Sequence, residues 1–221
     1  MSRPGLLNRL LTIHLPALVI VLLAVGPFAW LALTALTPSA AITATGVSLT
    51  PAGWSLANFD RLLLHTSFVG NMGNSLIVAV GTVILGLLVS VTAAYAFSRF
   101  RFRGRRVLML QFLLVNMFPV VLLILPLFIM MRWLGILDTH LALILANATV
   151  AIPFAVWMLT SYINAIPRSL DEAAMIDGAT HAQTFWTIIM PLVRPVLAVV
   201  GLLSFISSLG DFVIAKVVLQ D

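Results

Sequence analysis

The sequence predicts an all-α protein, a polytopic bundle of transmembrane helices. Of its 221 residues 62% are hydrophobic and only 9% are charged, and the mean hydropathy is +1.14. Soluble domains carry about 25% charged residues. The uncharged runs do not alternate polar and apolar residues, so they predict helices rather than strands of a β-barrel. Each run is long enough to cross the hydrocarbon core, which takes about 20 residues. The runs are 10–59, 62–98, 107–131 and 139–167.

The charge and cysteine content exclude several classes of protein. The net charge is +5 and the pI is about 11.1, but the arginines lie at the edges of apolar runs. No solvated basic face is left for a nucleic acid, so nucleic acid is excluded as a partner. The chain has no cysteine, which removes disulfide frameworks, thiol chemistry and cysteine metal sites. The absence of cysteine does not define the cellular compartment of the protein.

The first predicted span covers about 11–36. A secretory signal is the alternative, because the first nine residues are basic and Pro38-Ser39-Ala40 offers small residues near a plausible cleavage site. The apolar stretch is about 25 residues long, whereas the hydrophobic region of a signal peptide has roughly 7–15. We therefore expect an uncleaved transmembrane helix.

Four further spans complete a single transmembrane domain expected over residues 1–221. We place them at about 73–98, 107–131, 141–163 and 195–215. Prolines lie inside the third and fourth spans and remove backbone donors, so these helices are expected to be kinked or interrupted. These prolines are Pro119, Pro126 and Pro153.

Small residues recur every fourth position along the second span and predict a helix-packing seam. They are Gly86, Ser90, Ala94 and Ser98. Such a stripe lets another helix approach closely. Its partner is either another span of this chain or a second subunit.

The basic residues predict the orientation in the membrane. Nine fall on one side: Arg3, Arg9, Arg99, Arg101, Arg103, Arg105, Arg106, Arg168 and Arg194. Only Arg61, Arg132 and Lys216 fall on the other. The positive-inside rule then places the N-terminus in the cytoplasm, and five spans place Asp221 outside.

Residues 37–72 form the predicted outer loop. A short amphipathic pattern at 58–64 predicts a helix that lies on the membrane surface and is capped by Asn58. Docking of an external partner on this loop is the alternative.

The inner loop at 164–194 holds the most specific local pattern. Ser169 and Glu172 have the spacing of a capping box, which predicts a helix from Leu170 to about Asp177. Gly178 is placed to adopt the left-handed conformation that ends helices. The predicted helix is too short to be stable alone, because isolated helices need about 12–15 residues. It therefore needs a surface to pack against.

A second helix is expected directly after this glycine. Thr180 and Gln183 form another capping box, and Pro191 and Pro195 are expected to bound the helix on the far side. The first helix presents a small-residue face suited to a narrow cleft: Leu170, Ala173, Ala174 and Asp177. The second presents a bulkier stripe: Ala182, Phe185, Trp186 and Ile189. The pair is either a moving, piston-like element or a structural hairpin.

The same loop resembles a known sequence pattern. Its order is Glu172-Ala173-Ala174, then Gly178, then Ile188 and finally Met190-Pro191. This is similar to the EAA loop of binding-protein-dependent ABC importer permeases, in which leucine is usual where Met190 stands. Further segments resemble the sugar-transport branch of this permease family, specifically MalG-type permeases of the maltose system. The resemblance covers nearly the whole chain. These segments are 94–99, 101–104, 117–119, 177–180 and 204–206.

The resemblance implies a fold, a function and partners. The fold is that of an ABC type I importer permease, and the function is import of sugars such as maltose or maltodextrin-like oligosaccharides. Residues 172–174, Asp177, Gly178, Ile188 and Pro191 correspond to the coupling element that sits in a cleft of the ATPase. The partners are a second, MalF-like permease, a cytoplasmic ABC ATPase dimer and an extracytoplasmic sugar-binding protein, in a bacterial or archaeal inner membrane.

The chain is expected to be non-catalytic. A phosphate-binding loop is absent from the sequence, so ATP and Mg are expected on the partner ATPase. MalG-type permeases also have a sixth span and an inner C-terminal tail, and on this ground the chain is expected to be a fragment.

Other polar residues carry weaker signals. His14, His65, His140 and His181 have no second ligand at metal-binding spacing, so no metal site is expected. Asp211 is the only acid within a predicted span, where it either lines the pathway or lies at the interface. Three residues can bind sugar hydroxyls or neighbouring helices, and no substrate residue is assigned. They are Asn116, Asn147 and Thr149.

A self-contained channel or secondary transporter is the alternative function. It requires ion sites near the midplane and usually repeat symmetry, neither of which the spans display. A membrane enzyme is also disfavoured, because the sequence shows no acid–base pair and no nucleophile constellation.

Overall fold

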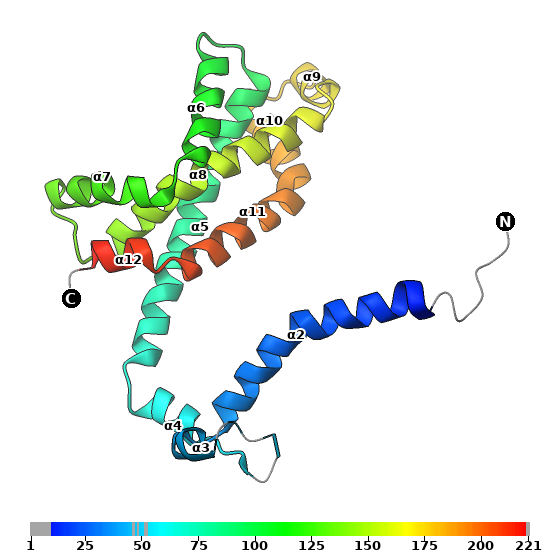
Figure 1. Cartoon of the computed structure of the whole chain (residues 1–221). Coiled ribbons are helices and arrows are strands. Elements are labelled where there is room, and N and C mark those ends of the chain that lie inside the picture. Colours follow the sequence, from blue (N-terminus) through cyan, green and yellow to red (C-terminus); the bar gives the residue numbers. More distant parts are fainter. Residues whose placement is uncertain (1–9, 46, 48, 51–52, 220–221) are drawn as a thin grey trace. The chain divides into compact units, whose positions relative to one another are not determined.

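The structure is a computed structural model that describes residues 10–45, 47, 49–50 and 53–219; its described elements are all helices, as predicted (Figure 1). In chain order they are the π-helix η1 (Leu10–His14), α2 (Leu15–Leu36), α3 (Ser39–Thr45), α4 (Ala57–Leu64), α5 (Phe68–Arg99), α6 (Arg105–Met117), α7 (Val120–Trp133), α8 (His140–Ala165), α9 (Ser169–Ile176), α10 (His181–Thr184), the π-helix η3 (Phe185–Ile189), α11 (Met190–Gly210) and α12 (Val213–Val218). The chain divides into two compact units, Met1–Asn71 and Met72–Asp221. Arg3, Arg9 and Asp221, used above for orientation, lie outside the described residues.

Within the described residues, four helical stretches are long and apolar enough to cross a membrane. They are Thr12–Leu36, Phe68–Arg99, His140–Ala165 and His181–Gly210. The second and third stretches contain the spans predicted at 73–98 and 141–163. The first contains nearly all of the span predicted at 11–36. The fourth contains most of the last span, whose predicted end lies five residues beyond Gly210.

The helix predicted over 107–131 is broken. Helices α6 and α7 meet at an angle of 106°, and Figure 1 shows α7 turned sharply away from α6. The break lies at Phe118, whose backbone is extended (φ −74°, ψ 132°) because the ring of Pro119 disfavours the helical conformation of the preceding residue. Pro126 and Pro153 lie inside α7 and α8 and end neither helix.

The helix after the glycine corner does not stop at Pro191 or Pro195. Residues His181–Gly210 form one continuous helical stretch through the π-helix η3. Within it the Met190 amide bonds the Phe185 carbonyl, five residues back. This wider register comes directly before Pro191, which has no amide to donate, so the chain stays helical past the proline.

The last long helix ends at Gly210. Asp211 has an extended backbone (φ −82°, ψ 98°), and its Oδ1 accepts a hydrogen bond from the Ile214 amide at 3.1 Å. An aspartate that caps a new helix stabilises its first turn. Asp211 therefore lies between α11 and α12, not within a span as predicted.

The core of the second unit is built from α5, α8, η3 and α11. Its buried members from α5 are Val91, Ala94 and Tyr95, and the others are Ala155, Leu159, Ile163, Phe185, Ile189, Val193, Val196 and Val200. A second cluster joins α5, α7, α8 and α12, and consists of Val78, Leu127, Met131, Ala142, Leu143, Ala146, Ile214 and Val218. These two clusters pack α5, from Val78 to Tyr95, against the helices that follow it.

The predicted seam on α5 is buried within the chain. Gly86, Ser90, Ala94 and Ser98 are all buried. A Cβ added at Gly86 would nevertheless meet no atom within 4 Å, whereas one at Gly81 would lie 2.5 Å from Ile144 Cδ1 of α8. Among the glycines of α5, Gly81 thus receives a side chain of α8 at close range, and the periodic pattern did not single it out.

In the first unit, Asn58 does not cap α4 as predicted. The cap position is Leu56, and Asn58 lies inside the helix. Its Nδ2 donates to the carbonyls of Ala35 and Thr37 at 3.0 and 2.8 Å, and its Oδ1 accepts from Ser39 Oγ at 3.0 Å. The carbonyls at the end of a helix lack partners within it. Asn58 therefore supports the C-terminal end of α2.

Candidate functional site at the helix–glycine–helix loop

The loop after α8 begins with α9, which is not capped by its own sequence motif. The helix begins at Ser169, and the predicted capping box between Ser169 and Glu172 is absent. The Glu172 amide bonds the Arg168 carbonyl at 3.0 Å instead. The guanidinium of Arg168 donates to the Ser98 carbonyl at 2.8 Å, and Arg168 has helical dihedrals. Ser169 consequently lies inside the helix rather than at its cap.

The glycine corner has the predicted geometry. Gly178 has φ +85°, which only glycine adopts without strain. The Ala179 amide bonds the Ala174 carbonyl at 2.9 Å and the Gly178 amide bonds the Met175 carbonyl at 3.1 Å, the two bonds of a Schellman motif. A Cβ at this position would meet no atom within 4 Å, so the backbone angle and not space requires glycine.

The second capping box is confirmed. Thr180 Oγ1 accepts from the Gln183 amide at 3.3 Å, while Gln183 Oε1 accepts from the Thr180 amide at 2.8 Å. This reciprocal pair satisfies donors that the first turn of α10 leaves free. The chain therefore turns at Gly178 and starts the next helix within three residues.

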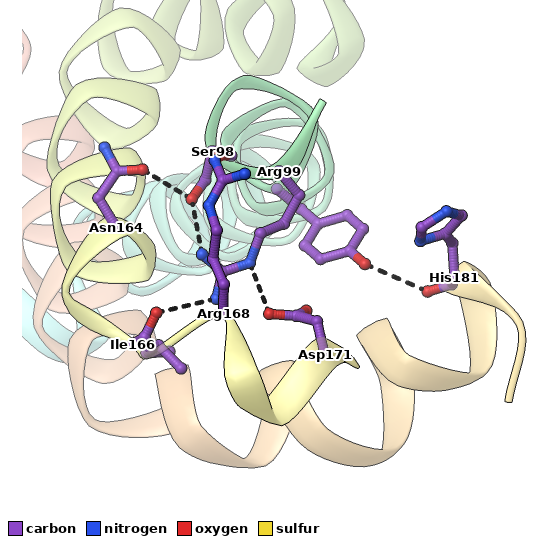
Figure 2. Close-up of polar contacts among 8 residues, drawn as sticks. Ser98, Arg99, Asn164, Ile166, Arg168, Asp171 and His181 are labelled. Atoms are coloured by element: carbon purple, nitrogen blue, oxygen red, sulfur yellow. Dashed lines mark hydrogen bonds and ion pairs between the residues drawn. The ribbon is translucent and has the colours of Figure 1, made fainter. Parts of the chain in front are cut away.

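A buried ion pair ties α9 to the end of α5. Arg99 Nε lies 2.9 Å from Asp171 Oδ2, and each side chain is only 7% exposed (Figure 2). The same guanidinium donates through Nη2 to the Ile166 carbonyl at 3.1 Å and through Nη1 to Ser98 Oγ at 3.3 Å. Arg99 thus bridges α5, the residue after α8 and α9 with one rigid, planar group.

Three further hydrogen bonds surround the ion pair. Ser98 Oγ donates to Asn164 Oδ1 at 2.7 Å, and the Ser98 carbonyl accepts from Arg168 (Figure 2). On the other side, the Tyr95 hydroxyl donates to the His181 carbonyl at 3.4 Å. Together with the ion pair these contacts form what we call the anchor: Tyr95, Ser98, Arg99, Asn164, Arg168 and Asp171. The anchor joins the last turn of α5 to both helices of the loop.

Aromatic packing continues the anchor into the core. The rings of Tyr95 and Phe185 are 5.0 Å apart, and those of Phe100 and His181 are 5.1 Å apart. The predicted stripe on the second helix is divided: Phe185 and Ile189 are buried in the core, whereas Ala182 and Trp186 are exposed. The loop is therefore held against the bundle from both of its helices.

Of the predicted face of α9, Leu170, Ala173 and Asp177 are exposed as expected, and only Ala174 is buried. Asp171 and Ala174 are buried, so Ala174 is not available to a partner as predicted. The residues that share an exposed face have i, i+3, i+4 and i+7 spacing, and we call them the free face. They are Ser169, Glu172, Ala173 and Ile176. Ile176 is 85% exposed and is the most exposed large apolar side chain of α9.

The remaining residues of the EAA pattern differ in exposure. Asp177 is the C-cap residue of α9 and is exposed. Ile188, in the π-helix, is half-buried, and Pro191 is exposed at the start of α11. The pattern thus combines surface positions with residues that set the geometry of the corner.

Sequence reasoning missed most of the anchor. The sequence gives Arg99 and Arg168 only as topology markers and does not single out Asp171. The available signal was an arginine that ends a long apolar run together with an acid in the following loop. Nothing in the spacing pairs two residues 72 positions apart.

A mostly apolar pocket of about 310 Å³ lies at the other end of α11. Its polar lining residues are Thr82, Asn147, Ser204, Ser207, Ser208 and Asp211. Asn147 Nδ2 donates to Ser208 Oγ at 3.2 Å, whereas Asn116 and Thr149 bond to carbonyls of their own helices. In the described part of the chain, no three His, Asp or Glu residues come together as a metal site.

The chain is similar to known transport proteins. Residues 83–221 match the family described as binding-protein-dependent transport system inner membrane component. The maltodextrin transport system permease protein MdxG of Bacillus subtilis is 33% identical over 76% of this chain and 60% of its own length. The trehalose/maltose transport system permease protein MalG of Thermococcus litoralis is 34% identical over 99% of this chain and 78% of its own length.

A solved structure is similar over the whole chain. It belongs to a bacterial ABC transporter involved in the import of the acidic polysaccharide alginate, with a TM-score of 0.85 and 28% identity. The match covers 100% of this chain and 78% of the solved one. The likeness extends to the backbone that carries the helix–glycine–helix loop.

Proposed function

We propose, from the premise that the chain belongs to the family of binding-protein-dependent transport system inner membrane components, that it is a permease subunit of an ATP-driven sugar importer. The observation that carries the proposal is the loop geometry: a short helix with an uncovered face, locked by a buried ion pair to a membrane-spanning helix. When a partner protein displaces α9, such an element can pass that movement on to α5 in the membrane. The chain itself supplies a path and no chemistry.

The substrate class follows from the relatives. Their names specify maltodextrin for one relative and trehalose or maltose for another. We therefore propose oligosaccharides of the maltodextrin type as the cargo.

The free face is the proposed contact with an ABC ATPase dimer, whose two nucleotide sites hold ATP and Mg. Glu172 lies in the first turn of α9, where its negative charge interacts favourably with the helix dipole, and Ile176 offers an apolar contact. A MalF-like permease completes the pathway, and an extracytoplasmic sugar-binding protein delivers the sugar. ATP binding then switches the paired permeases between inward and outward states because it moves α9 relative to the membrane.

The proposed orientation places the loop and the N-terminus in the cytoplasm. Arg101, Arg103, Arg105 and Arg106 lie between α5 and α6 or in the first turn of α6, at the same end of α5 as the anchor. Reporter fusions at Arg106 and at Arg61 test this arrangement. The fusion at Arg106 should report the cytoplasm and that at Arg61 the opposite side.

Reconstituted transport tests the function. The permease, its MalF-like partner and the ATPase are placed in vesicles with the binding protein and labelled maltotriose. Uptake that requires ATP, and that stops when the ATPase carries an inactivating substitution, is the expected result. Uptake that persists without the ATPase would support the self-contained channel or secondary transporter instead.

A further inference from the structure

A basic groove of about 930 Å³ lies between the turn that joins α5 to α6 and the end of α8. Arginines on both sides of Gly104 line it, among them Arg103, Arg105 and Arg106, and Asn164 lines it on the α8 side. Arg103, Arg106 and Asn164 are exposed and Arg105 is half-buried. The charged groups of the groove are therefore accessible to a ligand.

The arginines of the groove have no acidic partner in the structure. The sequence contains no aspartate or glutamate from 61 to 137, a range that includes α5, α6 and α7. Among the described residues the ion pair is that of Arg99 with Asp171, which belongs to the anchor. Arg103, Arg105 and Arg106 form no side-chain hydrogen bond or ion pair with any other residue that the structure describes. Like charges placed close together repel each other, so an anion from outside the chain would stabilise this cluster.

Local geometry holds the turn in place at the end of α5. Gly104 has φ +86° and is the N-cap residue of α6, so the chain reverses there into the next helix. The ring of Phe102 lies 5.6 Å from the ring of Phe97 on α5. Arg103 is thus fixed between a packed aromatic residue and a glycine that sets the backbone.

Apolar side chains continue the groove along α6. Val107 lines the groove, and Val107, Leu110 and Leu114 share one exposed face of α6 at i, i+3 and i+7 spacing. Helix α6 begins the apolar stretch that continues into α7. In a bilayer these side chains face lipid tails, while the arginines at the start of the helix lie at the level of the headgroups.

We propose that the groove binds an anionic phospholipid, with Arg103, Arg105 and Arg106 around its phosphate and the exposed face of α6 along one acyl chain. Guanidinium groups match the geometry of phosphate oxygens and bind them through paired hydrogen bonds. The volume lies near the upper end of small-molecule sites, roughly 300–1,000 Å³, and admits a headgroup with the start of its chains. The proposal concerns the chain as a membrane protein and is independent of its cargo and of its ATPase.

A lipid fits the groove better than a soluble phosphate compound. A soluble anion would use the arginines and leave the apolar lining in contact with water. A phospholipid satisfies both parts of the groove, because its phosphate meets the arginines and its chain covers Val107 and Leu110.

Native mass spectrometry of the purified full chain in detergent tests the site, because it counts bound lipids and gives their affinities. The anionic probe is dioleoylphosphatidylglycerol, and the reference is dioleoylphosphatidylcholine, which has the same chains and no net charge. We expect one phosphatidylglycerol to bind at least about fivefold more tightly than phosphatidylcholine, since each arginine near an anionic lipid contributes about that factor. Glycerol phosphate, added as a competitor, tests the soluble source and should not displace the lipid.

Substitutions of the arginines locate the site. Arg103→Gln and Arg106→Gln each remove one charge from a side chain without a partner among the described residues, so the helices should tolerate both. The Kd for phosphatidylglycerol should rise about fivefold in each and about 25-fold in the double variant, with no change for phosphatidylcholine. Arg103→Lys/Arg106→Lys keeps the charges that orient the chain and should lose less affinity than the double glutamine variant.

The chain provides a matched control outside the groove. Arg194 is exposed in the first turns of α11 and does not line the groove, so Arg194→Gln makes the same change of charge elsewhere. Its Kd for phosphatidylglycerol should stay within about twofold of wild type, because an exposed charge at a distance is screened.

Four outcomes would overturn the lipid site. They are equal affinity for the two phospholipids, displacement of the lipid by glycerol phosphate, an equal loss in Arg103→Gln and Arg194→Gln, and wild-type affinity in the double glutamine variant. An equal loss in the double lysine and double glutamine variants, with helix content unchanged by circular dichroism, would support the site and assign its affinity to the guanidinium geometry. Absence of ATP-driven sugar uptake would overturn the proposed function and leave this site in place.

Discussion

Removal of one partner of the Arg99–Asp171 ion pair should uncouple the loop from the bundle. Both side chains are 7% exposed, so water screens the pair poorly, and Asp171→Ala leaves the Arg99 charge buried and uncompensated. Breaking a buried pair in this way costs about 3–5 kcal/mol. Helix α9 has eight residues and is far below the length that is stable alone, so the loss should fall mainly on α9.

Hydrogen exchange and coupled transport measure this loss together. We expect the α9 amides of Asp171→Ala to exchange at least about 100-fold faster, since each 1.4 kcal/mol is worth a factor of ten. The ratio of sugar imported to ATP hydrolysed should fall in vesicles. Arg101→Ala, which removes an exposed arginine two residues away, is the control and should leave both quantities unchanged.

A double variant separates lost tethering from buried charge. Replacement of both partners by apolar residues of similar size, Arg99→Met with Asp171→Leu, removes the uncompensated charge and should restore most protection of α9. Wild-type exchange rates and a wild-type transport ratio in Asp171→Ala would refute the anchor as the link between α9 and α5.

Three further substitutions test local features. Gly178→Val should cost about 1–2 kcal/mol because a side chain is strained at φ +85°, and Gly178→Asn should cost less; ATP-dependent uptake measures both. Thr180→Ala should remove the second capping box at a cost of about 0.5–2 kcal/mol, seen as faster exchange of the α10 amides. Gly81→Ala places a Cβ 2.5 Å from Ile144 Cδ1 and should lower the melting temperature, with recovery in Gly81→Ala/Ile144→Ala.

The helices followed from the sequence because the bilayer leaves few alternatives. A long uncharged run must satisfy its own backbone, and composition alone reveals this. The consequences of proline were less predictable. Pro119 ends a helix through its effect on Phe118, whereas Pro191 follows a π-helical register that absorbs its missing amide. Composition does not distinguish the two situations.

The corner of the loop was predictable because it is local. Gly178 and the Thr180–Gln183 box are specified by neighbours in the sequence. The burial of Ala174, one member of the predicted α9 face, was not, because it lies on the same side of α9 as Asp171, which pairs with Arg99 across 72 residues. The role of Asn58 was missed for the same reason, since its partners are the distant carbonyls at the end of α2.

Site-specific cross-linking tests the central claim most directly, that the free face of α9 docks on an ABC ATPase. The chain has no cysteine, so each single-cysteine variant reports one position. Ile176 and Trp133 are 85% and 86% exposed, which makes Trp133→Cys, at the end of α7, a control of equal accessibility. In membranes that contain the importer, Ile176→Cys should cross-link to the ATPase and Trp133→Cys should not. Equal cross-linking from both positions, or none from Ile176→Cys in an importer that transports sugar, would contradict the account.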